Sequence, residues 1–343
     1  MRAMLLRAPA PVEQAPLVAV DLPDPRPGAD EVLVEVSVCG VCRTDLHTVE
    51  RDIPVPRLPI VPGHQVVGRV REVGADVTRF AVGDRVGVAW VHRFCGQCDA
   101  CVEGRENLCS QPTFTGYHVH GGYAERIVAP SAFVHPLPDT LSDDVQAAPL
   151  LCGGIIGYRA LKQSGLRPGA RVALYGFGSS AHVALPIALS WGCEVYVVTR
   201  SADARARAAD MGAAWTGTID EPPPRPVDHA VSFAPAGSVI APALEALRQG
   251  GTLALAGITV DRVPALDYDR HLFGERSLTT VKANTRADAR ELLAIAARVE
   301  IRTDVRTFAL EDANQALAAL KAGRLGAQAA VLTTDAWRAG GGA

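Results

Sequence analysis

The sequence predicts an α/β protein of two domains, a β-rich domain followed by a doubly wound parallel sheet. The first 150 or so residues are rich in Val, Gly and Pro, and short alternating runs at 32–38 and 65–73 predict strands between turns. Beyond this point strand patterns alternate with helical apolar spacing, which is typical of a parallel sheet. A chain of 343 residues has room for about two domains of roughly 150 residues.

The elements of the second half follow one another in the order that a doubly wound sheet requires. The apolar pattern predicts helices over 181–191 and 204–211, and two more in the tail, over 287–299 and 311–322. It predicts strands over 171–175, 194–199, 227–233 and 252–256.

Charge and hydropathy exclude several classes of partner. Lys plus Arg total 34 and Asp plus Glu total 37, a net charge of −3, which argues against nucleic acid as a partner. No apolar run approaches 18 residues, so no membrane span or membrane partner is predicted. The apolar stretch at the N-terminus is too short for a signal peptide, and we expect a cytoplasmic protein.

The cysteines indicate a metal site. Four of the eight fall within fifteen residues, at Cys95, Cys98, Cys101 and Cys109, and in a chain without an export signal such clustering favours metal over disulfides. Four thiolates complete a tetrahedral shell around Zn²⁺ and leave no open position, so the zinc would be structural. An iron–sulfur cluster, which also takes four cysteines, is the alternative.

A second group of candidate ligands is dispersed along the chain. Cys42 follows a predicted strand, His64 lies beside Gly63, and Cys152 precedes the second domain. Two thiolates and one imidazole leave the fourth position of a zinc ion open, as in catalytic sites. The alternative is a structural histidine and small buried thiols that bind nothing.

A glycine-rich loop after the strand over 171–175 predicts a dinucleotide site. In the pattern Gly176-x-Gly178-x-x-Ala181 the glycines allow a tight turn and a close approach of the backbone to a pyrophosphate at a helix N-terminus. A glycine-rich turn without a ligand is the alternative.

The end of the next strand bears on the choice of cofactor. NAD enzymes place Asp or Glu there, whereas this chain has Thr199, Arg200 and Ser201. A guanidinium flanked by hydroxyls suits a 2′-phosphate, so NADP is favoured over NAD. Alternatively, Arg200 is solvated or stacks on the adenine and serves either cofactor.

With these motifs in view, the sequence resembles the zinc-dependent alcohol dehydrogenases of the medium-chain dehydrogenase/reductase superfamily. The resemblance covers nearly the whole chain, in the family's order. It is carried by Gly40–His47, Gly63-His64, the four cysteines, Gly121–Glu125, Cys152-Gly-Gly and the Gly176 loop. It implies a GroES-like catalytic domain at 1–152 with a structural zinc lobe at about 92–110, a Rossmann cofactor domain at 153–283, and a return to the catalytic domain over 284–343.

The resemblance also implies roles for single residues. Cys42, His64 and Cys152 correspond to the catalytic zinc ligands, which makes two zinc ions per chain with the structural one. Asp45 corresponds to the carboxylate that orients His64, Thr44 to the hydroxyl that contacts the alcohol, and His47 to the outer end of the proton relay. Arg286 corresponds to the arginine at the cofactor pyrophosphate, and Trp90 to a residue of the substrate pocket. Cys39 and Cys193 match no ligand position and are expected to be packing residues.

The implied reaction is reversible hydride transfer between a primary or secondary alcohol and NAD(P), with an aldehyde or ketone as product. The resemblance implies a homodimer or homotetramer. One departure is Gln65, where the family has a glutamate near the zinc; Gln65 cannot ionise, which puts in doubt any step that needs that carboxylate. The alternatives are a zinc reductase of polyols or conjugated carbonyls, and a catalytically silent dinucleotide-binding protein with a structural or regulatory role.

Overall fold

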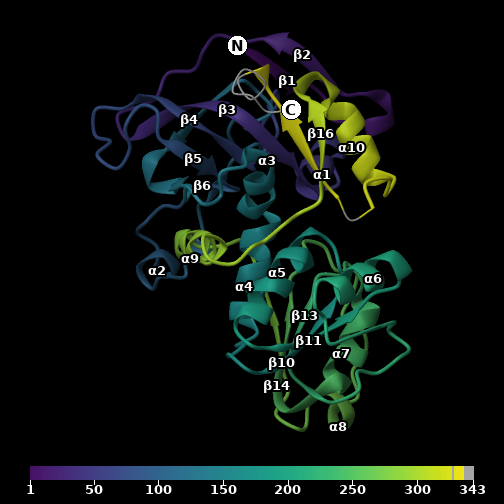
Figure 1. Ribbon diagram of the computed structural model, residues 1–343. Coiled ribbons are helices and arrows are strands. Elements are labelled where there is room, and N and C mark those ends of the chain that lie inside the picture. Colours follow the sequence, from purple (N-terminus) through teal and green to yellow (C-terminus); the bar gives the residue numbers. More distant parts are fainter. Residues whose placement is uncertain (327, 336–343) are drawn as a thin grey trace. The chain divides into compact units, whose positions relative to one another are not determined.

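The chain folds into two compact units, each described here by itself (Figure 1). The structure is a computed structural model that describes residues 1–326 and 328–335. Unit 1 comprises Met1–Cys152, Thr285–Ala297 and the chain from Thr303 on, whereas unit 2 comprises Gly153–Asn284 and Arg298–Arg302. The chain therefore leaves unit 1 after Cys152 and returns to it for its last segments.

Unit 1 is built on a seven-stranded sheet. Its order is β16-β17-β3-β4-β5-β9, with β8 also paired to β3, and all neighbours are antiparallel except β16 and β17. The predicted strands at 32–38 and 65–73 are confirmed as β3 and β4. The strands are β3 (Glu31–Val41), β4 (Val66–Val73), β5 (Arg85–Val88), β8 (Arg126–Pro130), β9 (Val134–Pro136), β16 (Val305–Ala309) and β17 (Ala329–Thr333).

Shorter elements surround this sheet. Two further pairs of strands are antiparallel, β1 (Arg2–Leu6) with β2 (Leu17–Asp21) and β6 (Val91–Arg93) with β7 (Thr113–Phe114). The helices of unit 1 are α1 (Arg43–Glu50), α2 (Asp99–Val102), α3 (Asp144–Ala147), α9 (Arg286–Ala296) and α10 (Ala313–Lys321). Its 3₁₀ turns are η1 (Val12–Gln14), η2 (Glu106–Leu108), η3 (Ser131–Phe133), η4 (Ala148–Leu151) and η6 (Leu310–Asp312).

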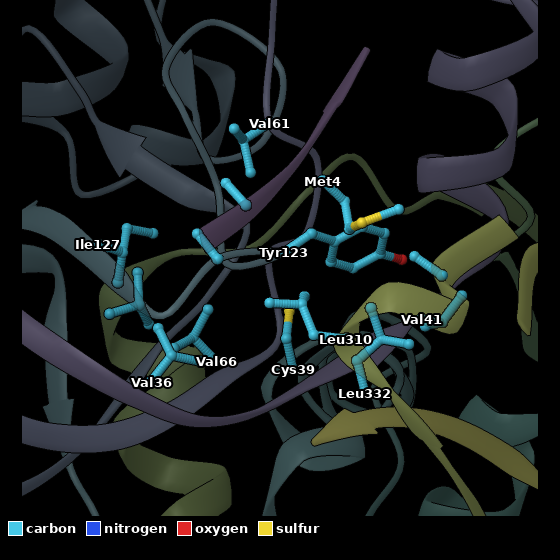
Figure 2. Close-up of a cluster of buried hydrophobic side chains, with 14 of the residues drawn as sticks. Met4, Val36, Cys39, Val41, Val61, Val66, Tyr123, Ile127, Leu310 and Leu332 are labelled. Atoms are coloured by element: carbon cyan, nitrogen blue, oxygen red, sulfur yellow. The ribbon is translucent and has the colours of Figure 1, made fainter. Parts of the chain in front are cut away.

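The core of unit 1 contains side chains from both ends of the chain. Val36 and Cys39 of β3 pack near Tyr123 and Met4, and Leu332 of β17 joins the same buried cluster (Figure 2). Because removal of these apolar side chains from water stabilises the fold, the C-terminal strand is held in unit 1 by its own hydrophobic face.

Unit 2 is a six-stranded sheet in which all neighbouring strands are parallel. Its order, β12-β11-β10-β13-β14-β15, confirms the predicted doubly wound sheet, and the order reverses between β10 and β13. The strands are β10 (Arg171–Tyr175), β11 (Glu194–Val198), β12 (Trp215–Gly217), β13 (Val227–Ser232), β14 (Leu247–Leu255) and β15 (Ser277–Thr280). Its helices are α4 (Gly153–Gln163), α5 (Ser179–Ser190), α6 (Ala202–Asp210), α7 (Ile240–Ala246) and α8 (Tyr268–His271), with the 3₁₀ turn η5 (Gly237–Val239).

In unit 2 the sequence pattern located four of the six strands and the helices α5 and α6, but it missed α7, α8 and the eleven-residue helix α4. β14 begins at Leu247, five residues before the predicted start, and the edge strands β12 and β15, of three and four residues, were not predicted. Strands this short carry too few residues for a periodic signal. In the part of the chain that the structure describes, no helix has the length and apolar character needed to cross a membrane.

Candidate active site

The four clustered cysteines form one compact group with the donor set of a metal site. Their Sγ atoms all lie within 4.8 Å of one another, with Cys95 and Cys101 3.9 Å apart and Cys95 and Cys109 3.4 Å apart. Zn–S bonds of 2.3 Å at tetrahedral angles place two sulfurs about 3.8 Å apart, so the group fits a zinc ion.

Backbone amides donate hydrogen bonds to the sulfur atoms of these cysteines. The amides of Cys98 and Cys95 donate to Cys95 Sγ and Cys109 Sγ, each at 3.4 Å, and the amide of Gln111 also donates to Cys109 Sγ, at 3.3 Å. Backbone hydrogen bonds from Ser110 and Cys101 lower the pKa of the Cys98 thiol to about 6. Burial raises the pKa of the Cys101 thiol to about 12, so the hydrogen bonds favour the metal-binding thiolate at Cys98 and not at Cys101.

The second ligand group is brought together by strand pairing and by the 3₁₀ turn η4. Cys42 follows β3 and His64 precedes β4, and the amide of Gly40 donates to the carbonyl of Gln65 at 2.9 Å where these strands pair. Cys42 Sγ and His64 Nε2 lie 3.2 Å apart, and Cys152, which follows η4, completes a set within 4.8 Å. The three predicted ligands therefore meet in unit 1, and three ligands leave a fourth position of a zinc ion open.

Asp45 holds two of these ligands in place. Its Oδ1 accepts from His64 Nδ1 at 3.0 Å and from the amide of Gly63 at 3.2 Å, while its Oδ2 accepts from the amide of Cys42 at 2.9 Å. The bond to Nδ1 leaves Nε2 of His64 as the metal-binding atom. Gly63 has φ +99°, and a Cβ on it would lie 2.4 Å from the Tyr123 ring, so a side chain does not fit beside His64.

The charges of this group favour a cation. A hydrogen bond from Cys152 and the charge of His64 lower the pKa of Cys42 well below its ordinary value. Burial opposes the charged form of His64, but Cys42 and Asp45 outweigh it and raise the pKa of His64 well above its usual range. The bond to Cys42 and burial raise the pKa of Cys152 well above its ordinary value, so the negative charge of the group comes from Cys42 and Asp45. These two charges, buried together, stabilise a positive charge between them, which a divalent ion supplies.

The predicted relay residues lie on α1, directly after the first ligand. Thr44 and His47 are three residues apart and therefore share one helix face. Thr44 is buried, and its amide donates to Cys42 Sγ at 3.3 Å. His47 Nδ1 lies 2.9 Å from Oδ2 of the exposed Asp52, a partner that the sequence analysis did not identify.

Gln65, which follows the proposed ligand His64 in the chain, is buried. It is 4% exposed, and its Nε2 has no hydrogen-bond partner among the described residues. Its carboxamide packs against Gly40, where a Cβ would lie 2.9 Å from Cδ and Oε1. The neutral amide avoids a further buried carboxylate in unit 1, which would carry a desolvation cost of its own.

The glycine-rich loop of unit 2 has the geometry of a nucleotide-binding turn. Gly176 follows β10 with φ +86°, a left-handed conformation that side chains rarely adopt, and Gly178 is the N-cap of α5. A Cβ on Gly178 would meet nothing within 4 Å, so this helix end has space for a ligand, and Ala181 is fully buried in the helix. Amides at a helix N-terminus bind phosphate groups, so the loop fits a dinucleotide.

The three residues predicted to set cofactor choice lie between β11 and α6. Arg200 and Ser201 are exposed, and Thr199 is half-buried. The Ser201 hydroxyl caps α6 by accepting from the amide of Ala204 at 3.2 Å. Arg205 donates to the carbonyls of Thr199 and Arg200, at 2.8 and 2.9 Å, and so fixes the backbone that carries the exposed guanidinium of Arg200.

Arg286 begins α9 and binds Glu106 of the cysteine lobe. Its Nε and Nη2 donate to Glu106 Oε2 at 3.0 and 2.7 Å, and its backbone amide donates to Oε1 at 2.7 Å. Its guanidinium also lies over the Phe133 ring, 4.8 Å from the centroid. No local sequence pattern indicates Glu106 as a partner, and the role of Arg286 at a pyrophosphate stays a prediction. Cys39 and Cys193, expected as packing residues, are both buried.

Two family models match this chain. The family model described as "Alcohol dehydrogenase GroES-like domain" matches residues 28–139, and the model described as "Zinc-binding dehydrogenase" matches residues 181–298.

Individual relatives match over most of their length. A probable alcohol dehydrogenase of Mycobacterium tuberculosis is 48% identical over 97% of both chains. An alcohol dehydrogenase of Geobacillus stearothermophilus is 40% identical over 86% of this chain and 89% of its own. Among solved structures, a cinnamyl alcohol dehydrogenase of Sorghum bicolor has a TM-score of 0.87 at 26% identity and 97% coverage of both chains.

Replacement of single cysteines should separate the two metal sites. Cys95→Ser removes a ligand of the lobe, so we expect the loss of one zinc per chain and a lower melting temperature, because a structural metal contributes to folding. Cys42→Ser should lose the other zinc and leave the fold largely intact. Metal analysis and thermal melts check both variants, and a Cys42→Ser protein that keeps two zinc ions would contradict the ligand assignment.

The contact between Glu106 and Arg286 should stabilise unit 1. Glu106→Ala removes several charge-assisted hydrogen bonds, and we expect a loss of about 1.5–3 kcal/mol in the free energy of unfolding. The matched control is Glu103→Ala in the same lobe, because Glu103 pairs with Arg105 and both are exposed; such a pair contributes about 0–1 kcal/mol. Equal losses in the two variants, measured by denaturant unfolding, would refute this account.

Proposed function

Because the chain belongs to the zinc-binding alcohol dehydrogenases of the medium-chain dehydrogenase/reductase superfamily, we propose that Cys42, His64 and Cys152 hold its catalytic zinc. The function is reversible oxidation of an alcohol to an aldehyde or ketone with a nicotinamide cofactor. The observation that carries the ligand proposal is the meeting of these three side chains within 4.8 Å, with His64 fixed by Asp45.

In the proposed mechanism, side chains of α1 remove the proton of the alcohol. A zinc ion held by the three ligands would supply the Lewis acid that lowers the pKa of an alcohol hydroxyl, and a bound nicotinamide would supply the hydride acceptor. Thr44 accepts the alcohol proton as it gives up its own hydroxyl proton toward His47, and His47 releases a proton to solvent. The contact of Asp52 with Nδ1 of His47 favours the tautomer whose free Nε2 accepts that proton.

We propose that the cysteine lobe holds a second, structural zinc. Its four sulfur atoms lie within 4.8 Å of one another, and four thiolates complete a tetrahedral shell around zinc that leaves no position for a substrate. The iron–sulfur alternative is less favoured, because the family is a zinc-binding one. The silent dinucleotide-binding alternative is not favoured either, because the ligand set and the hydroxyl beside it are complete.

The cofactor proposal is NADP(H), bound by unit 2. Gly176, Gly178 and Ala181 form the turn for the pyrophosphate, and the exposed guanidinium of Arg200 pairs with a 2′-phosphate. Thr199 and Ser201 replace the carboxylate that would repel such a phosphate. Arg286 is proposed as a further pyrophosphate ligand on the resemblance alone.

A homodimer or homotetramer is the proposed assembly. β15 is an edge strand with β14 as its one neighbour in the described sheet, so its outer backbone groups are free to pair with a second copy. The segment before it exposes the large apolar side chains of Ile258, Val263 and Phe273. Exposed apolar groups beside an edge strand favour association through this side of the sheet.

A panel of alcohols and aldehydes, assayed with both cofactors, tests the proposed function. We expect turnover in the wild type and a loss of at least about 100-fold in Cys42→Ser, because the metal supplies several kcal/mol of transition-state stabilisation. Cys193→Ser is the matched control, since this buried thiol belongs to neither metal group. Wild-type turnover retained in Cys42→Ser would contradict the mechanism.

The cofactor preference is tested by the ratio of kcat/KM for NADPH to that for NADH. We expect a ratio above one in the wild type and a drop of about tenfold or more in Arg200→Ala, because one charge-assisted hydrogen bond contributes about 1.5–3 kcal/mol. Arg207→Ala, in the last turn of α6, serves as a control for the loss of a positive charge in this unit. A wild-type preference for NADH, or a ratio unaffected by Arg200→Ala, would refute the proposal.

A further inference from the structure

Trp90 stands between a proposed zinc ligand and a group of aromatic side chains in unit 1. Its ring meets His64 edge-on, with the centroids 4.9 Å apart. The indole stacks on the Phe114 ring, with the centroids 4.7 Å apart and an interplanar angle of 11°. The Tyr117 ring centroid lies 5.7 Å from that of the indole. Because His64 belongs to the proposed metal group, the Trp90 indole lies directly beside that group.

The segment 114–120 holds the Trp90 indole in place. His118 accepts from the amide of Phe114 at 3.2 Å, and its ring contacts the rings of Phe114 and Tyr117 at 5.5 and 4.9 Å. The two aromatic neighbours of Trp90 are thus packed against a third ring. A rotation of the indole away from His64 would break its stacking with Phe114 and its contact with Tyr117 together.

Tyr117 also connects this segment to the loop that follows α1. Its Oη donates to the carbonyl of Pro54, and Arg57 Nη2 of the same loop lies 3.4 Å from His120 Nε2. The amide of Val61 donates to His120 Nδ1 at 3.1 Å. Among these connections Tyr117 is the residue whose ring also contacts Trp90, so it links the position of the indole to the position of the loop.

We propose that Tyr117 is a positioning residue that holds Trp90 against His64 and thereby sets the width of the substrate site. The proposal rests on the function proposed above. With Phe114 and Tyr117 in place, the indole cannot yield to a wide substrate. The site therefore favours slender, unbranched primary alcohols and their aldehydes over ring-shaped or branched secondary alcohols.

The test is the ratio of kcat/KM for cyclohexanol to that for ethanol, measured in a double-mutant cycle. Tyr117→Ala should raise this ratio about fivefold or more, because the indole loses its support and yields to the wider substrate. Trp90→Ala should raise the ratio at least as much. Since Tyr117 acts through Trp90, adding Tyr117→Ala to Trp90→Ala should change the ratio less than twofold.

Two further variants separate positioning from general stability. Tyr117→Phe keeps the ring and loses the bond to Pro54, so we expect an intermediate ratio. Tyr196→Phe is the matched control, because it also removes one tyrosine hydroxyl hydrogen bond, to Glu194 in unit 2, and should keep the wild-type ratio. If Tyr117→Ala does not fold, the same cycle is run with Tyr117→Phe.

The possible outcomes separate the positioning role of Tyr117 from the proposed dehydrogenase function. An unchanged ratio in a folded Tyr117 variant, or an equal effect with and without Trp90, overturns the positioning role while the dehydrogenase function stands. No turnover of any alcohol or aldehyde by the wild type overturns the proposed function, and this inference with it.

Discussion

The buried carboxylate of Asp45 is the group on which the rest of the site depends. It is 2% exposed, and a buried charge is costly unless hydrogen bonds satisfy it. The amides of Cys42 and Gly63 and the ring of His64 satisfy it together, at 2.9 to 3.2 Å. One side chain thereby fixes the start of α1, the turn before β4 and the orientation of a metal ligand, so the fold of unit 1 and the chemistry of the site have the same origin.

The surrounding fold makes this arrangement possible. Pairing of β3 with β4 places Cys42 and His64 at the same end of the sheet, and the buried cluster that includes Leu310 and Leu332 anchors the returning chain in the same unit. The first helix then places Thr44 and His47 directly after the first ligand. In this arrangement Gln65 contributes no charge, and Asp45 remains the carboxylate that contacts the ligand histidine.

The extent to which the sequence could predict these features depends on how far apart the partners lie along the chain. The four lobe cysteines fall within fifteen residues, so their spacing alone indicated a metal. Cys42, His64 and Cys152 are dispersed over 110 positions, and the family resemblance was needed to group them. The contacts of Arg286 with Glu106 and of Tyr117 with Pro54, 180 and 63 residues apart, arise from tertiary packing and leave no local pattern.

The most direct measurement of the central claim is the affinity of the two metal sites in Asp45→Asn. This substitution keeps the shape of the side chain and removes its charge, so we expect the affinity of the Cys42 site for zinc to fall about 10- to 100-fold. The cysteine lobe, which Asp45 does not contact, should retain its zinc, as followed by titration with a competing chelator. Wild-type affinity at both sites would contradict the account.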